Sequence, residues 1–335
     1  MDKRVIFAVA GSGKTSHIVK SLSLDKRSLI ITYTNNNYTN LYNRILKKFN
    51  NVWPANISLM TYERFLLGFC YKPFLADVWK ARKLCFAPPT NNRVSKNSRM
   101  FYVTSDNHLY YNRLATLVEE YAIDDIKERL MKYFDEFVLD EVQDIAGRDF
   151  SLLEKLMEIS MNMLFVGDFY QHTFDTSRDG MVNKNLHSNY DAYIKRFSKH
   201  GVMVDTDSLV NSWRCSNSIC EFVSDKLGVR MGSNRKDDTV IKFLEDRKMV
   251  EEMKKDKNIV KLCLRKAYTF GLSYRNWGDT KGEDCYNDVC VLLNKNTFNK
   301  YKQDKLDELS PLTRNKLYVA ITRAHGNVYL IEGGI

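Results

Sequence analysis

The residues with the clearest chemical meaning stand near the start of the chain, in the sequence FAVAGSGKTSHIVKSL. Gly11 and Gly13 allow successive backbone N–H groups to point at one anion, and a following helix would add the positive end of its dipole. Lys14 would reach the outer phosphates of a nucleotide, and Thr15 is placed to bind Mg²⁺ through its hydroxyl. The strict phosphate-loop pattern has glycine where this chain has Ala8, so the motif needs support from elsewhere.

A pair of acidic residues supplies that support. In the sequence FVLDEVQD an apolar strand ends in Asp140 and Glu141. One carboxylate could hold Mg²⁺ while the other polarises an attacking water. Two acids at the start of a helix would also be stabilised there without any catalytic role. The phosphate loop and the acidic pair together favour a site that hydrolyses a nucleotide.

Two arginines in the second half of the chain could complete such a site. Arg214 stands in NSWRCSN and Arg323 in LYVAITRAH. Phosphoryl transfer gains mainly from positioning and from cations placed where negative charge accumulates. Either arginine alone could equally form a surface salt bridge. Beside the loop and the acidic pair, both become candidates for contact with the γ-phosphate.

The composition is that of a globular protein and limits the other function classes. The chain has 335 residues, 44% hydrophobic and 27% charged, and a net charge of +10. This charge fits a polyanionic partner, although lysine and arginine are interleaved with acidic residues. The seven cysteines contain no C-x-x-C pair, so neither a disulfide framework nor a structural zinc site is indicated. We expect a nucleic acid as partner.

The apolar segments are too short for a membrane protein. No run of about 18 apolar residues occurs. The apolar residues 5–10 are too few for a signal peptide and lead directly into the phosphate loop. The sequence therefore predicts a cytoplasmic protein with no membrane partner.

Apolar strands alternate with amphipathic helices along much of the chain, which predicts parallel sheets with helices on both faces. The predicted strands of the first half are residues 5–9, 29–33, 57–60, 136–140 and 162–168. Helices are predicted at residues 16–22, 41–49 and 63–69. In the second half, strands are predicted at residues 240–244, 259–264, 289–293 and 328–331.

Residues 72–132 interrupt this alternation. Prolines and asparagines predict a loop over residues 86–99, and FYVTSDNHLYY predicts a β-hairpin that turns at Ser105, Asp106 and Asn107. A charged amphipathic helix is predicted over residues 114–133. We interpret this segment as an inserted subdomain.

Eight ordered motifs resemble those of superfamily 1 helicases of the UvrD/Rep type. The resemblance covers most of the chain except residues 72–132 and 228–258. AVAGSGKT resembles motif I, in which relatives commonly tolerate alanine at the first position, and VLDEVQD resembles motif II. The others are IITYTNNNYTNLYNRI (Ia), SLMTYERF (Ic), LFVGDFYQHTF (III), NSWRCSNSI (IV), DTKGEDCYNDVCVLL (V) and KLYVAITRAHGNVYLI (VI). The Y-V-A-x-T-R-A sequence of the last is the most specific.

The resemblance implies a role for each matching position. Lys14 would bind the β- and γ-phosphates, Thr15 and Asp140 would hold Mg²⁺, and Glu141 would be the general base. Gln171 would sense the γ-phosphate, and Arg214 and Arg323 would be arginine fingers. Either Glu283 or Asp284 would reach the ribose, since both residues can be aligned with the acidic position of motif V. The residues expected to bind ATP are Ala10, Gly11, Ser12, Gly13, Lys14, Thr15, Ser16 and Glu283.

The same resemblance implies a channel for single-stranded nucleic acid. Its expected contacts are Tyr33, Thr34, Asn35, Thr61 and Phe174. Aromatic side chains in such channels stack on bases, and Tyr62 and Trp213 also lie inside the motifs. All of these aromatics could instead be packing residues.

The implied architecture is α/β, with two RecA-like domains, a small inserted subdomain, and ATP hydrolysed with Mg²⁺ in the cleft between the domains. Domain 1A would comprise residues 1–71 and 133–204, a reduced 1B-like insertion residues 72–132, and domain 2A residues 205–335. The interval between motifs IV and V is too short for a 2B subdomain. Thr176 stands where relatives place an aromatic wedge, so strand separation is less secure than strand binding.

The sequence thus predicts a compact, ATP-dependent translocase or helicase on single-stranded nucleic acid, with DNA favoured over RNA. Two alternatives share every ATP motif. One is a DNA-stimulated ATPase that acts as a switch or regulatory subunit, with a nuclease or replication factor as partner. The other is an RNA-directed helicase.

Overall fold

The computed structural model describes residues 2–89, 93–174, 180–237 and 239–333. Their contacts divide the chain into two compact units, which we describe separately. Unit 1 comprises Met1–Ile6, Thr15–Gly167 and Asp175–Asp205, and unit 2 comprises Phe7–Lys14, Asp168–Phe174 and Thr206–Ile335. The phosphate loop and the motif III segment therefore group with the second half of the chain. The predicted domain boundary at residues 204 and 205 stays a prediction.

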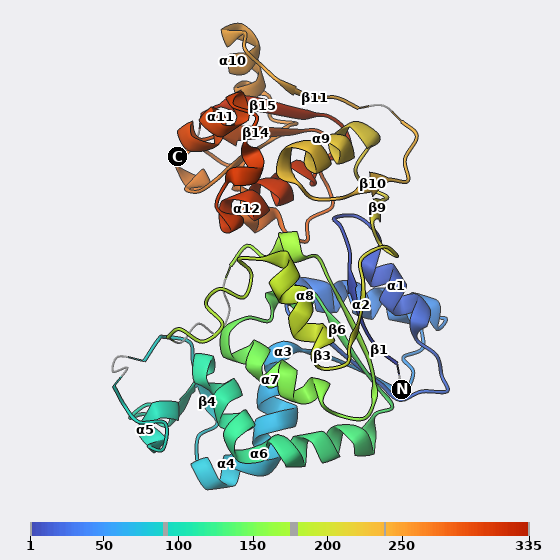
Figure 1. Cartoon of the computed structure of the whole chain (residues 1–335), viewed down its shortest axis with the longest axis vertical. Coiled ribbons are helices and arrows are strands. Elements are labelled where there is room, and N and C mark those ends of the chain that lie inside the picture. The colour runs from blue at the N-terminus through green and yellow to red at the C-terminus, as the bar shows by residue number, and fades with distance from the viewer. Residues whose placement is uncertain (1, 90–92, 175–179, 238, 334–335) are drawn as a thin grey trace. The chain divides into compact units, whose positions relative to one another are not determined.

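Unit 1 is built on a six-stranded sheet in the order β3-β2-β6-β7-β1-β8 (Figure 1). The pairs β1–β8, β2–β3, β2–β6 and β6–β7 are parallel. The strands β2 and β6 are buried along their whole length, as expected for central strands covered on both faces. The strands are β1 (Lys3–Phe7), β2 (Ser28–Thr32), β3 (Ile57–Thr61), β6 (Glu136–Asp140), β7 (Asn162–Gly167) and β8 (Met203–Asp205).

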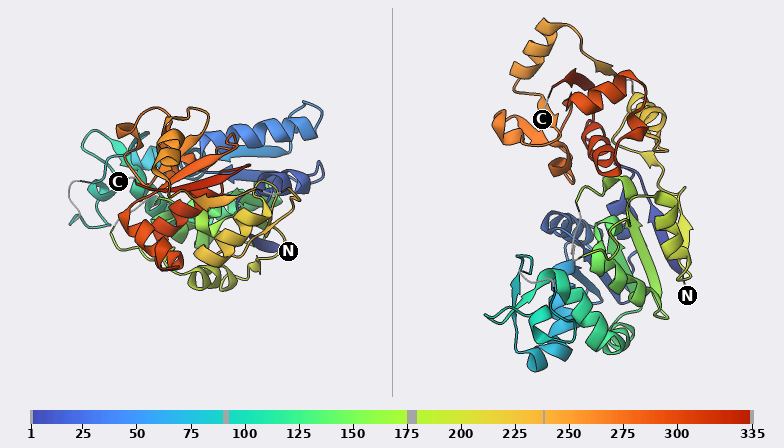
Figure 2. Two further views of the ribbon diagram at one scale, coloured as in Figure 1. Left: turned by 90° about the horizontal axis from the view of Figure 1, so that it is seen from above. Right: turned by 60° about the vertical axis from the view of Figure 1, so that its left-hand side comes forward.

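Helices cover both faces of this sheet, as the two views of Figure 2 show. Amphipathic spacing explains them: α2 buries Leu41 and Ile45, four residues apart, and leaves its charged face outside. The helices of this part are α1 (Lys14–Ser21), α2 (Asn35–Lys48), α3 (Tyr62–Arg64), α7 (Gly147–Met157) and α8 (Tyr190–Ser198), with the short 3₁₀ turn η2 (Val142–Asp144). The 3₁₀ turn η3 (Phe169–Gln171) belongs to unit 2. The alternation predicted from sequence is confirmed.

The insertion consists mainly of the helices α4 (Lys72–Trp79), α5 (Arg99–Tyr102) and α6 (Tyr111–Tyr133), and the π-helix η1 (Phe65–Tyr71) leads into it. The helix predicted over residues 114–133 is confirmed as α6, although Ala122, with a φ of −148°, kinks it. Residues 90–92 of the predicted loop lie outside the described residues.

The predicted β-hairpin in the insertion is wrong. The strand β5 (His108–Tyr110) pairs in parallel with β4 (Lys83–Cys85), and only one antiparallel bridge, Val103 to Leu109, remains of a hairpin. Ser98 caps α5 by accepting a hydrogen bond from Met100 N at 3.3 Å, so the residues expected to form the first strand are helical.

Unit 2 contains a five-stranded sheet in the order β11-β15-β14-β12-β13, and all four of its strand pairs are parallel. A cluster of buried residues packs against it, and Val9 and Ala10 from the phosphate loop belong to this cluster. The strands are β11 (Ile241–Phe243), β12 (Val260–Cys263), β13 (Tyr274–Asn276), β14 (Val289–Leu293) and β15 (Val328–Glu332). The short strand β13 was not predicted.

The remaining elements of unit 2 surround that sheet. They are β9 (Asn211–Ser212), β10 (Gly232–Ser233), α9 (Asn217–Leu227), α10 (Arg247–Lys255), η4 (Ala267–Thr269), η5 (Trp277–Thr280), α11 (Lys295–Lys302), η6 (Leu306–Glu308) and α12 (Pro311–Ile321). All seven cysteines of the chain are free thiols, and five are buried. Within the described residues, no helix combines the length and the apolar character that crossing a bilayer requires.

Candidate functional site

The phosphate loop follows β1 and ends at the first residue of α1. Gly11 has a φ of 72° and Gly13 a φ of 92°, conformations that favour glycine. The hydroxyl of Ser12 is buried, and no hydrogen-bond partner for it exists among the described residues. Glycines with positive φ, an unsatisfied hydroxyl and Lys14 at a helix start suit an anion such as a phosphate.

Residues of unit 2 that follow the loop's own segment lie directly against it. The backbone N–H of Trp213 donates to Gly11 O at 2.9 Å. A Cβ added at Gly11 would lie 2.6 Å from Arg214 Cβ and 2.7 Å from Ser212 Oγ. Glycine is therefore required here by close approach as well as by φ. This contact brings the backbone of Arg214 to the phosphate loop.

A chain of hydrogen bonds connects three of the predicted motifs within unit 2. Ala10 N donates to the hydroxyl of Tyr318 at 2.8 Å, and this hydroxyl donates to Asp168 Oδ2 at 2.8 Å. Burial, reinforced by the negative charge of Asp168, raises the pKa of Tyr318 well above its usual value. The phenol therefore stays protonated and can act as donor and acceptor at once. Asn315 adds a bond from Nδ2 to His172 O at 3.0 Å.

Arg214 is held by an ion pair. Its Nε donates to Asp284 Oδ1 at 2.6 Å, and its Nη1 donates to Thr322 O at 3.3 Å. His325 Nε2 lies 2.8 Å from the same Asp284 oxygen. Burial alone would raise the pKa of Asp284, but Arg214 and His325 outweigh it and lower this pKa. Asp284 is ionised at neutral pH and balances Arg214.

Arg323 is fully buried, with 1% of its surface exposed. Its guanidinium donates only to backbone carbonyls: Val319 at 3.2 Å, Thr280 at 3.4 Å and Glu283 at 3.0 Å. Within the part of the chain that the structure describes, no carboxylate forms an ion pair with it. Burial, and then the charge of Arg214, lower the pKa of Arg323 to about 10. The side chain still carries its charge at neutral pH.

The two candidates for ribose contact, Glu283 and Asp284, have different hydrogen-bond partners. The carboxylate of Glu283 accepts a hydrogen bond from the hydroxyl of Tyr286, whereas Asp284 is occupied by Arg214. Gln171, the predicted γ-phosphate sensor, is buried in η3, and its N–H donates to Asp168 O at 2.9 Å. The roles of Glu283 at the ribose and of Gln171 at the γ-phosphate remain predictions.

The acidic pair lies at the carboxyl end of β6 in unit 1. Asp140 is buried, and its Oδ1 accepts a hydrogen bond from Glu141 N at 3.0 Å. Glu141 has a left-handed backbone, with a φ of 56°, which is uncommon for a residue with a side chain. The amide of Gln143 donates to the Glu141 carboxylate. The turn after β6 therefore fixes both the backbone and the carboxylate of Glu141.

The two remaining residues of the predicted nucleotide site lie in the first turn of α1. Thr15 is partly exposed. Ser16 Oγ accepts a hydrogen bond from Arg44 Nη1 at 2.9 Å, so part of its hydrogen-bonding capacity is already used. The oxygen donors of Thr15 and Asp140 are of the type that Mg²⁺ prefers.

Four of the five predicted nucleic-acid contacts gather at one edge of the unit 1 sheet. The strands β2 and β3 are neighbours with Thr32 opposite Thr61, so residues 33–35 lie beside Thr61. The rings of Tyr33 and Tyr62 are stacked, with centroids 6.0 Å apart. Phe174 belongs to unit 2 and is 44% exposed. Thr176 lies outside the described residues.

The two threonines of this group also cap helices. Thr34 Oγ1 accepts a hydrogen bond from Asn37 N at 3.2 Å, and Thr61 Oγ1 accepts one from Arg64 N at 3.4 Å. Each hydroxyl therefore has a structural role at a helix N-terminus and keeps its own hydrogen for another acceptor. The start of α2 at Asn35 adds the positive end of a helix of 14 residues.

Sequence reasoning missed several residues that hold the phosphate loop in place through hydrogen bonds or close contacts. Tyr318, Asp168 and Ser212 all lie within the recognised motifs, but their types alone did not reveal hydrogen bonds between distant segments. A tyrosine within the apolar run of residues 317–321 could have been the signal, because a buried phenol needs a hydrogen-bond partner. Trp213 is 68% exposed and stays a possible stacking residue.

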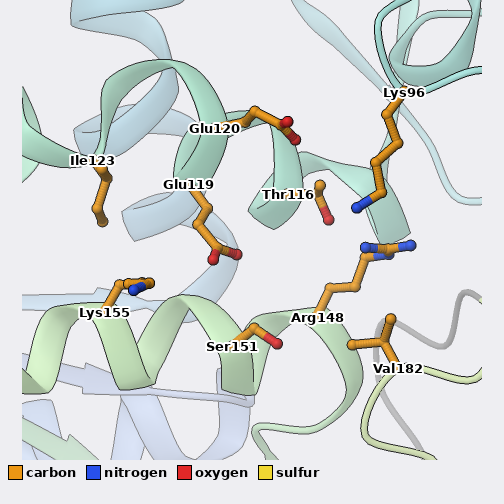
Figure 3. A pocket seen from close by; sticks show the side chains of 9 residues that line it. All are labelled: Lys96, Thr116, Glu119, Glu120, Ile123, Arg148, Ser151, Lys155 and Val182. Carbon is orange, nitrogen blue, oxygen red and sulfur yellow. The ribbon is translucent and has the colours of Figure 1, made fainter.

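A cavity of about 400 Å³ lies in unit 1, outside the predicted site residues (Figure 3). Figure 3 shows the charged ends of Lys96 and Arg148 converging near the hydroxyl of Thr116, while the Glu119 carboxylate points toward Ser151. Burial raises the pKa of Glu119, an effect that Lys155 opposes. The lining residues are Lys96, Thr116, Glu119, Glu120, Ile123, Arg148, Ser151, Lys155 and Val182. Because both charge signs line this cavity, it does not indicate one ligand class.

No family model matches the sequence, and no curated protein matches it. Solved structures do match. A structure of arterivirus nonstructural protein 10 (helicase) in complex with DNA has a TM-score of 0.52 and 14% identity, and covers 98% of this chain and 60% of its own. The structure of PRRSV helicase has a TM-score of 0.50 and 13% identity, and covers 98% of this chain and 52% of its own.

These likenesses establish the fold. This chain shares the α/β architecture of parallel sheets flanked by helices with two viral helicases, and the predicted fold of RecA-like domains is confirmed. The chain spans between about half and three fifths of the length of these structures. At 13–14% identity, what those proteins bind or catalyse is not transferred to this chain by the match alone.

Proposed function

We propose that this protein is a compact superfamily 1 motor of the UvrD/Rep type, which hydrolyses ATP with Mg²⁺ and moves along single-stranded nucleic acid, more readily DNA than RNA. The observation that carries this proposal is the contact between the phosphate loop and the arginine segment, through Trp213 N–H to Gly11 O at 2.9 Å. The fold shared with two viral helicases supports the same function. A loop that binds phosphates beside Arg214 suits a triphosphate whose hydrolysis requires cations.

The chain supplies the groups that would hold the nucleotide. The backbone N–H groups of Gly11 and Gly13 and the Ser12 hydroxyl would donate to phosphate oxygens, and Lys14 would neutralise the β- and γ-phosphates. Thr15 and Asp140 would hold Mg²⁺, and Ser16 would add a donor next to them. When bound, Mg²⁺ neutralises charge on the phosphate oxygens. Glu283 is our candidate for the ribose.

Hydrolysis would use the acidic turn and the two arginines. Glu141 would take a proton from the attacking water at its carboxylate, which the amide of Gln143 orients. Gln171 would respond to the γ-phosphate, and Arg214 and Arg323 would stabilise the negative charge that develops on it. Arg323 suits this role because it is buried and bonded only to neutral carbonyls.

Nucleic acid would bind at the edge formed by β2 and β3. Tyr33, Thr34, Asn35 and Thr61 would contact the strand, through ring stacking and through the start of α2, and Phe174 would contribute from unit 2. Nucleotide binding would be coupled to both units through a covalent bond. Lys14 belongs to unit 2 and the directly bonded Thr15 to unit 1, so a phosphate gained or lost at this loop bears on both units.

The deciding experiment is ATP hydrolysis by the full chain, measured with and without single-stranded DNA or RNA. We expect stimulation by the strand. Glu141→Gln should lower the stimulated rate by roughly 10² to 10⁴-fold while nucleotide binding persists, because it removes the base alone. Lys14→Ala should lower both hydrolysis and binding. Glu128→Gln, an exposed carboxylate on α6, is the matched control and should hydrolyse like the wild type.

Robust hydrolysis by Glu141→Gln would contradict the assigned base. An ATPase rate that neither DNA nor RNA changes would contradict the proposed motor function. A forked duplex assayed alongside separates an unwinding enzyme from the alternative, a DNA-stimulated ATPase that acts as a switch. A rate stimulated only by RNA would identify an RNA-directed helicase.

A further inference from the structure

Residues 264–273, between β12 and β13, form an exposed loop in unit 2 that none of the motifs includes. Leu272 is 95% exposed, Tyr268 is 81% exposed and Phe270 is 39% exposed. Single exposed apolar side chains are common, but three within five residues form a concentrated apolar surface. Such a surface on a folded unit indicates binding of a partner.

The loop is ordered by its own hydrogen bonds. Phe270 N donates to Ala267 O at 3.0 Å, and Lys261 N donates to Ser273 O at 3.0 Å. Arg275 Nη1 donates to Leu272 O at 2.9 Å. Ala267 belongs to a buried cluster of unit 2, and Tyr274 packs against that cluster. The loop therefore has a buried side, and its exposed residues are held outward on a fixed backbone.

The charged residues in this stretch of the sequence are all basic. Between Asp256 and Asp279 the sequence contains five lysines and arginines and no acidic residue. Lys261 is buried, but Lys257, Arg265, Lys266 and Arg275 are exposed. Exposed aromatic rings beside these cations are the combination that single-stranded nucleic acids require, because bases stack on rings and phosphates bind cations.

The loop is tied to the start of the predicted motif V. Asn276 accepts a hydrogen bond from Ala267 N at 2.9 Å through Oδ1, and its Nδ2 donates to Asp279 Oδ2 at 2.6 Å. One side chain thus joins η4, which carries Tyr268, to the residue that opens the segment 279–293. Nucleic acid bound at this loop could therefore affect the segment 279–293 through the hydrogen bonds of Asn276.

We propose that residues 264–273 bind unpaired nucleotides, with Tyr268 stacking on a base and Arg265 and Lys266 contacting the neighbouring phosphates. This inference rests on the proposed function and adds a contact surface in unit 2, separate from Tyr33, Thr34, Asn35 and Thr61. An acidic protein or an anionic membrane could also meet basic and apolar side chains. The aromatic ring of Tyr268 beside the cations favours a nucleic acid.

The test is binding of a fluorescein-labelled oligothymidylate by the full chain, followed by anisotropy. Tyr268→Ala should weaken binding by about 5- to 150-fold, which corresponds to the roughly 1–3 kcal/mol of one stacked base. Tyr268→Phe should bind like the wild type, and Tyr268→Leu should behave like alanine, because stacking needs a ring. Tyr133→Ala, an exposed tyrosine on α6, is the matched control and should change nothing.

The cations have a separate readout. Changing both Arg265 and Lys266 to glutamine should reduce the slope of log affinity against log salt by about two, one for each lost phosphate contact. ATP hydrolysis without nucleic acid should remain at the wild-type rate in all these variants and shows that they are folded.

Wild-type binding with unchanged affinity in Tyr268→Ala would overturn this inference and leave the proposed function standing. Absence of binding by the wild type would instead contradict the proposed motor. Affinity retained in Tyr268→Leu together with capture on phosphatidylserine vesicles would overturn the inference in favour of a membrane surface.

Discussion

The two arginines that we propose as contacts of the γ-phosphate are held in opposite ways. The side chain of Arg214 is 13% exposed and is neutralised by Asp284 at 2.6 Å, which is itself 60% exposed. Arg323 is buried, and its partners are neutral carbonyls. Arg214 already has a counterion and must exchange it to meet another anion, whereas Arg323 forms no ion pair with a described residue.

This difference separates two physical roles. A buried cation without a counterion is costly, and an anion arriving beside it removes part of that cost. An ion pair with an exposed carboxylate gains little, so it can break at a small cost. We infer that Arg323 contributes more to transition-state stabilisation and that Arg214 contributes a contact regulated by Asp284.

The largest expected effect is on hydrolysis by Arg323→Ala. We expect its kcat to fall by roughly 10³-fold or more, as for arginine fingers in related chemistry. Arg323→Lys should recover little, because an ammonium cannot reproduce the planar guanidinium. Steady-state ATPase assays check this. A rate within a few-fold of the wild type would return Arg323 to a structural role.

Arg214→Ala should have a smaller effect, a fall of roughly 10² in kcat, comparable to the loss of one charge-stabilising donor. Asp284→Asn sharpens the comparison. If Asp284 competes for Arg214, KM for ATP should fall, since the arginine no longer needs to exchange partners. A rise in KM would indicate instead that Asp284 contacts the ribose. A larger loss from Arg214→Ala than from Arg323→Ala would reverse our assignment.

The smallest expected effect is on stability. Without nucleotide, Arg323→Met should melt at the same temperature as the wild type or slightly higher, because methionine removes a buried charge at similar volume. A nucleotide should then stabilise the wild type more than the variant. Differential scanning calorimetry with and without a non-hydrolysable ATP analogue checks both. A clear drop in melting temperature would show that the three carbonyl bonds outweigh the buried charge.

The sequence predicted the sheets well because their signals are local. The run of apolar residues at 289–293 predicts a buried strand whatever lies around it. The apolar strand at residues 136–140 is seen to end at Asp140 because this residue is charged. The predicted hairpin at residues 105–107 failed because Ser98 begins a helix where a strand was expected. The strand β13, with the sequence YRN, is held by its pairing with β12, which sequence alone does not reveal.

In the candidate site, too, local features were predicted and contacts between distant residues were not. Glycines, lysine and acids were found by type and spacing, since each has a fixed chemical meaning. The hydrogen bonds from Ala10 to Tyr318 and from Tyr318 to Asp168 join residues far apart in the chain. No local pattern encodes such contacts, and the same holds for the ion pair of Arg214 with Asp284.

The left-handed backbone of Glu141 has an evolutionary consequence. A residue with a side chain held at a φ of 56° costs of the order of 1 kcal/mol or more, and glycine or asparagine would relieve much of it. Replacing Glu141 by glycine should therefore raise resistance to denaturant while abolishing turnover. If Glu141 is the general base that we propose, selection for stability alone would favour the inactive variant, and the strained glutamate is retained at a cost in stability.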